Sequence, residues 1–147
     1  FTLQFSKLYL YVLELKDNLL VSLEDEWSFC EAYLALQQMR FGKSLQVDYQ
    51  VSKDRSKLSL PPLALQIALE NALKHNQIST QTPLYIRVFE EARKLVVQNN
   101  LQKKAVNVVK STQVGIQNIK ERYRLIGKEE PEFIEDTNNY IVKLPLS

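Results

Sequence analysis

Residues 62–75 constrain the fold more than any other part of the chain. They follow Pro61, and proline is tolerated in the first turn of a helix. When these residues are placed at about 100° intervals, the apolar side chains gather on one arc and the polar ones on the other. The apolar arc consists of Leu65, Ala68, Leu69, Ala72 and Leu73. The segment is therefore predicted to be a helix with one buried side, which a second layer of structure must cover.

Two more helices are predicted around this one. Ser22 precedes three acidic residues, as is typical of a helix start, and the helix is predicted to reach Phe41 and to end at Gly42. A later helix is predicted over residues 113–126, closed by Gly127.

Alternation of apolar and polar residues predicts the strands. Single strands are predicted at 45–51 and 57–60, and two hairpins at 84–99 and 132–144. Residues 100–112 are polar and aperiodic, which predicts a loop. The order of elements predicts a two-layer α/β sandwich, in which helices cover one face of a mixed, mostly antiparallel sheet and a helical segment comes first.

A seam of apolar residues marks the start of the chain. Its members recur at alternating three and four residues and are Phe5, Leu8, Val12, Leu15 and Leu19. This spacing predicts a helix over residues 3–20. The helix either lies on its own domain or belongs to a dimerising bundle, and the pattern fits both.

Composition narrows the class of protein. The 147 residues suit a single domain, and 45% hydrophobic with 24% charged residues is typical of a globular one. The net charge of +2 is scattered, which gives no indication of a nucleic-acid partner. The single cysteine, Cys30, excludes an internal disulfide and fits a reducing compartment. No apolar run approaches a membrane span, and the start at Phe1 without methionine suggests a piece of a longer protein.

Four segments, in order, resemble the LytS-type sensor histidine kinases of the GHKL ATPase superfamily. Pro61-Pro62-Leu-Ala-Leu-Gln running into Glu70-Asn71-Ala-Leu-Lys-His is similar to the family's N box. The other three segments are Leu36-Gln-Gln-Met-Arg-Phe-Gly42, Gly115-Ile-Gln-Asn-Ile-Lys-Glu-Arg-Tyr123 and Tyr140-Ile-Val-Lys-Leu-Pro145. Glu-Asn-Ala alone is a weak signal, whereas four segments in the right order are specific. The resemblance implies the GHKL (Bergerat) version of the predicted sandwich.

The resemblance implies a Mg²⁺-ATP site. Asn71 is expected to offer its side-chain oxygen to Mg²⁺, which prefers oxygen ligands. Glu70 is expected to be the catalytic residue, as a base for the attacking histidine or by orienting a metal-bound water. Lys74 and His75 are expected to meet phosphate oxygens, since phosphoryl transfer needs mainly positioning and charge neutralisation. The alternative is that Glu70, Asn71 and Lys74 form only an outward, solvated face with an i,i+4 ion pair.

Two glycine-rich motifs of the family lack some of their usual glycines in this chain. Asn99 occupies the place of the aspartate that reads the adenine amino group, and no glycine follows. A neutral acceptor in place of a charged one predicts about tenfold weaker binding. Gln113 replaces a usual glycine, which leaves Gly115 to let the backbone approach phosphate. Lys104 is expected to compensate with positive charge over the triphosphate, together with Lys103 and Lys110, although all three also fit ordinary loop lysines.

The resulting hypothesis is an ATP-binding catalytic domain at residues 21–147, preceded at 1–20 by part of a dimerisation helix. It would transfer the ATP γ-phosphoryl group to a histidine outside this chain, and would not autophosphorylate alone, because the only histidine, His75, lies in the N box. The intact kinase is expected to be a homodimer that phosphorylates a response regulator, with this domain in the cytoplasm and membrane contact only through other segments. The alternatives are a degenerate module that serves as a dimerisation or regulator-binding platform, and an ATP-hydrolysing machine of the same superfamily.

Overall fold

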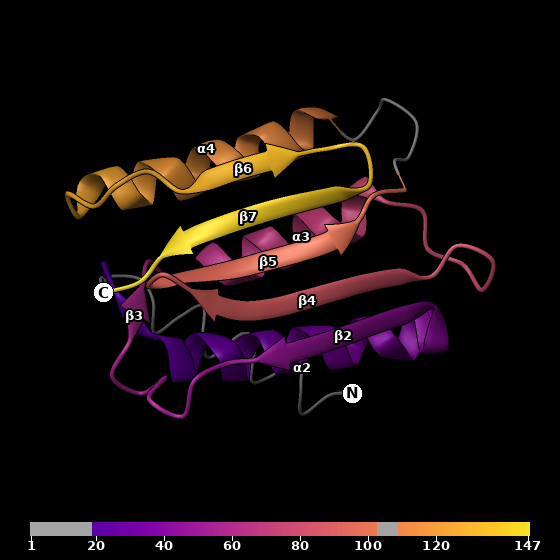
Figure 1. Cartoon of the computed structure of the whole chain (residues 1–147), viewed down its shortest axis with the longest axis horizontal. Coiled ribbons are helices and arrows are strands. Elements are labelled where there is room, and N and C mark those ends of the chain that lie inside the picture. The colour runs from indigo at the N-terminus through magenta and orange to yellow at the C-terminus, as the bar shows by residue number, and fades with distance from the viewer. Residues whose placement is uncertain (1–18, 103–108) are drawn as a thin grey trace.

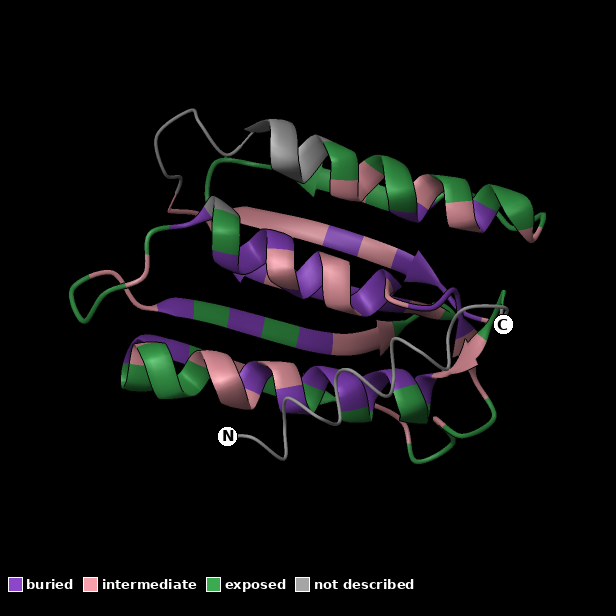
Figure 2. Ribbon diagram, turned by 180° about the vertical axis from the view of Figure 1, so that it is seen from behind, coloured by how far each residue is buried: buried purple, intermediate pink, exposed green. Residues whose placement is uncertain are grey.

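The chain folds into two layers, a sheet and a set of helices on one of its faces (Figures 1 and 2). The computed structural model describes residues 19–102 and 109–147, without the side chains of His75 and of residues 109–113. The α-helices of this part are α2 (Leu23–Phe41), α3 (Ala64–His75) and α4 (Val109–Leu125). Seen from the helix side, α3 lies between α2 and α4 (Figure 2).

The main sheet has five strands in the order β2-β4-β5-β7-β6. Their bounds are β2 (Leu45–Gln50), β4 (Leu84–Glu91), β5 (Lys94–Asn100), β6 (Glu132–Glu135) and β7 (Asn139–Pro145). Only β2 pairs in parallel, with β4, and the other neighbours are antiparallel. The predicted two-layer sandwich with a mixed, mostly antiparallel sheet is confirmed.

The predicted start and end of helix α2 are also confirmed. Ser22 caps α2, since its hydroxyl accepts a hydrogen bond from the Asp25 backbone N–H at 3.1 Å. Gly42 ends the helix with a φ of +57°, a conformation that L side chains rarely adopt. The predicted helix over residues 3–20 lies outside the described residues up to residue 18, and Leu19 and Leu20 are not helical.

The strand predicted at 57–60 does not join the main sheet. It shortens to β3 (Ser59–Leu60) and pairs antiparallel with β1 (Val21–Ser22) in a separate two-stranded sheet. Pro61 follows at once and has no N–H for a longer ladder. The partner β1 immediately precedes α2, so this small sheet ties the start of α2 to the start of α3.

Helix α4 begins at Val109, four residues before the predicted start. The loop prediction for residues 109–112 is therefore wrong. Ile119 belongs to the hydrophobic core and Ile116 lines a cavity, whereas the sequence Lys-Ser-Thr-Gln at 110–113 gives no helical period. Residues 109–112 thus extend α4 although their sequence shows no helical pattern of apolar residues. Among the described residues, no helix has the length and hydrophobicity to cross a bilayer.

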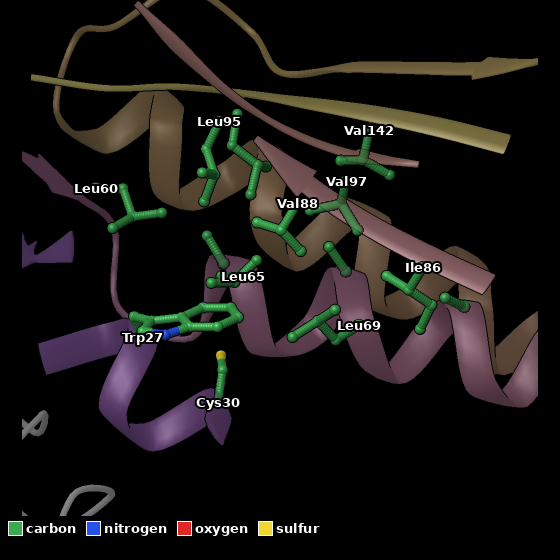
Figure 3. Packing of buried hydrophobic residues seen from close by; sticks show 14 of the residues in the cluster. Trp27, Cys30, Leu60, Leu65, Leu69, Ile86, Val88, Leu95, Val97 and Val142 are labelled. Carbon is green, nitrogen blue, oxygen red and sulfur yellow. The ribbon is translucent and has the colours of Figure 1, made fainter. Parts of the chain in front are cut away.

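The core lies between α3 and the sheet (Figure 3). Leu65 and Leu69 of α3 are fully buried and face Val88 and Val97 of the sheet, which are each 1% exposed. Burying a leucine or valine side chain contributes about 1.5–3 kcal/mol, so the apolar arc fixes how α3 docks. That docking leaves the C-terminal turns of α3 beside the ends of β5 and β7.

Candidate functional site

A buried carboxylate holds the start of α3. Leu63 precedes the helix with a φ of +67° and gives no side-chain cap. Glu26 of α2, 0% exposed, accepts hydrogen bonds from the backbone N–H groups of Leu63 at 3.1 Å and Leu65 at 2.9 Å. A carboxylate at this end also suits the positive pole of the helix dipole. From α4, Arg122 Nη1 donates to Pro62 O at 3.1 Å, so both flanking helices fix the direction of α3.

Asn71 is buried and does not belong to an outward, solvated face, unlike in the alternative interpretation. It is 7% exposed, because α4 packs against α3 at this point. A Cβ added to Gly115 would lie 3.1 Å from Ile67 Cγ2 and 3.3 Å from Asn71 Oδ1, so the two helices meet through this glycine. Gly115 therefore lies in the interior of α4, in contact with α3, rather than near the helix start. Within the described part of the chain, the Asn71 carboxamide has no hydrogen-bond partner.

Asn71 and Asn99 line the same cavity. Its volume is about 160 Å³, and its lining consists of Asn71, Ala72, Asn76, Asn99, Ile116, Glu135 and Tyr140. The sheet side is one row of cross-strand partners, because Asn99 of β5 is opposite Tyr140 of β7, which is opposite Glu135 of β6. Side chains of directly opposite residues share a face, so this row forms a floor under the end of α3. The structure thus unites the predicted metal ligand with the predicted adenine reader.

The Asn99 side chain has a defined orientation. It is 2% exposed, and its Nδ2 donates to the backbone oxygen of Asn100 at 2.8 Å. This hydrogen bond places the amide nitrogen at the backbone, and the side-chain oxygen has no donor among the described residues. An acceptor is therefore left for a ligand.

Asn76 closes one end of the cavity and is fully used by the protein. It is 1% exposed, donates from Nδ2 to Ala72 O at 2.8 Å and accepts at Oδ1 from the Gln102 N–H at 2.6 Å. The Gln102 side chain in turn donates to the carbonyls of Gln77, Thr82 and Pro83. This network fixes the segment that follows β5 against the loop that follows α3.

Glu70 and Lys74 lie on another side of α3. They form the i,i+4 ion pair foreseen in the alternative interpretation, and Gln66 Nε2 donates to the second Glu70 oxygen at 2.8 Å. Lys74 lines a separate groove of about 390 Å³, whose other residues include Tyr33 and Arg40 of α2. Burial and then the charge of Glu70 raise the pKa of Tyr33 above its usual value. The polar residues of the N box are thus divided between two hollows.

Two predicted site residues lie outside the described structure. These are Lys104 and the side chain of His75, and Lys103 and the Lys110 side chain are outside it as well. Their roles remain predictions.

The one charged side chain in the described lining is the carboxylate of Glu135. Burial and then the negative charge of Glu135 raise the pKa of Tyr140, so its phenol stays protonated. Across residues 19–102 and 109–147, no cluster of three or more His, Cys, Asp or Glu side chains could hold a metal by itself. The free carboxamide oxygen of Asn71 fits a cation that takes one protein ligand and completes its shell with water and phosphate, as Mg²⁺ does.

Sequence reasoning missed three contributors. Glu26 appeared only as one of the acidic residues of a helix start, although its carboxylate caps a different helix. Asn76 directly follows the segment that resembles the N box, and Tyr140 begins the last family-like segment, but only the packing of α3 on β5 and β7 brings them to the cavity. These positions in the sequence were the sole signal available.

Comparisons with known proteins show which proteins the chain is similar to. The model of the histidine kinase family matches residues 1–45. The sensor protein LytS of Bacillus cereus is 32% identical over 138 residues, covering 83% of this chain and 23% of the relative. LytS of Streptococcus mutans is 40% identical over 55 residues, which cover 37% of this chain and 9% of the relative. The chain thus spans less than a quarter of the length of these curated relatives.

Solved structures show the same fold. The cytoplasmic segment of histidine kinase QseC has a TM-score of 0.57 at 16% identity, over 88% of this chain and 78% of that one. The Acinetobacter baumannii histidine kinase AdeS has a TM-score of 0.53 at 8% identity, over 97% and 74%. With its mixed sheet covered by helices on one face, its N-box helix and these relatives, the chain belongs to the LytS-type sensor histidine kinases.

Proposed function

We propose that residues 21–147 form the ATP-binding catalytic domain of a sensor histidine kinase, which transfers the ATP γ-phosphoryl group to a histidine outside this chain. The observation that carries the proposal is that Asn71 and Asn99, distant in sequence, line one cavity, and that the side-chain oxygen of each has no hydrogen-bond donor among the described residues.

The cavity offers complementary chemistry to an adenine nucleotide. Asn99 Oδ1 is an acceptor for the exocyclic amine of the base, and Ala72 and Ile116 supply apolar walls. Asn71 is the residue proposed to hold Mg²⁺, which when bound neutralises phosphate charge. Because Gly115 of α4 packs against the Asn71 side chain, the Asn71 oxygen is positioned before any ligand arrives.

Glu70 is proposed to accept the proton of the attacking histidine. Both of its carboxylate oxygens are engaged, one by Lys74 and the other by Gln66, so the group is held along the surface of α3. Lys74, His75 and Lys104 are proposed to contact phosphate oxygens, with Lys74 approaching from the groove beside α2.

The rest of the proposal concerns the intact protein. Residues 1–20 are proposed to continue a dimerisation helix, and a response regulator is the proposed recipient of the phosphoryl group. The domain is proposed to lie in the cytoplasm, attached to an inner membrane through other segments.

Titration calorimetry with Mg²⁺-ATP tests the proposal. Saturable binding that requires Mg²⁺ is expected for the parent chain, and Asn71→Ala is expected to abolish the Mg²⁺ dependence. Since the Asn71 amide has no protein partner among the described residues, the variant should keep its melting temperature within a few degrees. Gln46→Ala is the matched control, because it removes an exposed carboxamide from the edge strand β2 and should leave binding unchanged.

Two results would contradict the proposal. No binding up to millimolar ATP would favour a platform without catalysis. Steady release of phosphate by the isolated chain would instead indicate an ATP-hydrolysing machine.

A further inference from the structure

We propose that the nucleotide cavity discriminates only weakly between adenine and guanine. The group that contacts the base is the neutral carboxamide of Asn99, which can rotate and so either accept or donate a hydrogen bond. This inference rests on the proposed nucleotide site and specifies its ligand class as purine nucleotides rather than adenine nucleotides alone.

The Asn99 amide is oriented by one neutral hydrogen bond. Nδ2 donates to Asn100 O at 2.8 Å, and the opposite oxygen has no donor among the described residues. In this orientation Asn99 accepts from a base that carries an amine, as adenine does at its sixth position. Rotation of the amide by half a turn exchanges nitrogen and oxygen and presents a donor to the carbonyl that guanine carries there.

Rotation of the Asn99 amide breaks one hydrogen bond. It removes the hydrogen bond to Asn100 O and places the amide oxygen near that carbonyl. Loss of one neutral hydrogen bond predicts that ATP binds about tenfold more tightly than GTP, which corresponds to about 1.4 kcal/mol. A carboxylate has no donor in either orientation, so an aspartate at this position would reject guanine much more strongly.

Three of the other described side chains of the lining, Ala72, Ile116 and Asn76, give little reason for stricter selection, while Glu135 and Tyr140 are the remaining polar residues of the lining besides Asn71. Ala72 and Ile116 are apolar and contact any planar base. Asn76 is committed at both ends of its amide, to Ala72 O and to the Gln102 N–H, and is not free to read a base. Among these groups, selection between the purines depends mainly on Asn99.

Competition binding tests the inference. The parent chain and the Asn99→Asp variant are titrated with Mg²⁺-ATP and Mg²⁺-GTP at equal ionic strength, and circular dichroism monitors folding. In the parent chain the GTP to ATP ratio of dissociation constants is expected to be about ten, and Asn99→Asp is expected to widen the ratio at least tenfold.

Each departure from these results has a distinct meaning. A parent ratio above about one hundred, or a ratio that Asn99→Asp leaves unchanged, would overturn the inference while ATP binding itself stands. If neither nucleotide binds to the parent chain or to the folded variant, the proposed nucleotide function fails and the inference fails with it. A folded Asn99→Gln variant provides a second arm, because it keeps the neutral amide and should keep the ratio within about threefold of the parent.

Discussion

Replacing Gly115 by alanine should separate stability from nucleotide binding. In the interior of α4 the exchange gains about 0.8–1.0 kcal/mol in helix preference. The added Cβ would lie 3.1 Å from Ile67 Cγ2 and 3.3 Å from Asn71 Oδ1, so both side chains must yield by a few tenths of an ångström. Such overpacking costs about 1–3 kcal/mol. The two effects oppose each other, and the net loss of stability should be between about 0 and 2 kcal/mol.

Binding should suffer more than stability does. The displaced Asn71 oxygen would no longer stand where it is proposed to meet Mg²⁺, and the loss of one such interaction lowers affinity by about tenfold or more. Calorimetry gives the affinity for Mg²⁺-ATP, and urea unfolding gives the stability. In the double variant with Asn71→Ala, the Gly115→Ala effect on affinity should disappear, because both changes act on the same group.

Gly127→Ala is the matched control. Gly127 follows the same helix with a φ of +70° and has no atom within 4 Å of an added Cβ. Alanine there should cost about 1–2 kcal/mol in backbone strain and leave ATP affinity unchanged. The reasoning would be refuted if Gly115→Ala bound Mg²⁺-ATP as tightly as the parent chain, or if Gly127→Ala weakened binding equally.

Two further predictions concern stability. Glu26→Gln leaves one acceptor for the amides at the start of α3 and should cost about 2–3 kcal/mol, measured by urea unfolding; a loss below about 0.5 kcal/mol would contradict the capping role. Tyr123 donates from its hydroxyl to Pro145 O at 2.8 Å, so Tyr123→Phe should cost about 1 kcal/mol near neutral pH. Burial, and then Glu26, raises the pKa of Tyr123, so its folded state holds a proton that the unfolded chain releases above about pH 10. Stability should therefore fall as pH rises past that value, and Tyr123→Phe should make the fall shallower; an unchanged slope would show that other groups cause it.

Much of the fold follows from local pattern. The apolar arc of residues 62–75 predicted the docking side of α3, and Ser22 and Gly42 predicted the limits of α2. These signals are readable because capping and periodicity involve residues only a few positions apart. The start of α4 was missed, since residues 110–113 show no apolar period and are helical only as an extension of a docked helix.

The site was less predictable, because its geometry depends on contacts distant in sequence. Helical spacing leaves both Asn71 and Glu70 off the apolar arc, but the packing of α4 at Gly115 buries Asn71, whereas Glu70 lies near Tyr33 of α2. Likewise, nothing near Glu26 shows that it caps a helix 37 residues later. The resemblance to the kinase family suggested the roles of the site residues, and only the packing of the helices on the sheet shows which of these residues line the same cavity.

The most direct test of the nucleotide site follows the side-chain amide resonances of the ¹⁵N-labelled chain during titration with Mg²⁺-ATP. The site predicts that the signals of Asn71 and Asn99 shift together and saturate at one dissociation constant, while the Gln46 signal on the far edge strand stays in place. Saturable shifts elsewhere with Asn71 and Asn99 unmoved would show that the nucleotide binds outside this cavity and would contradict its assignment.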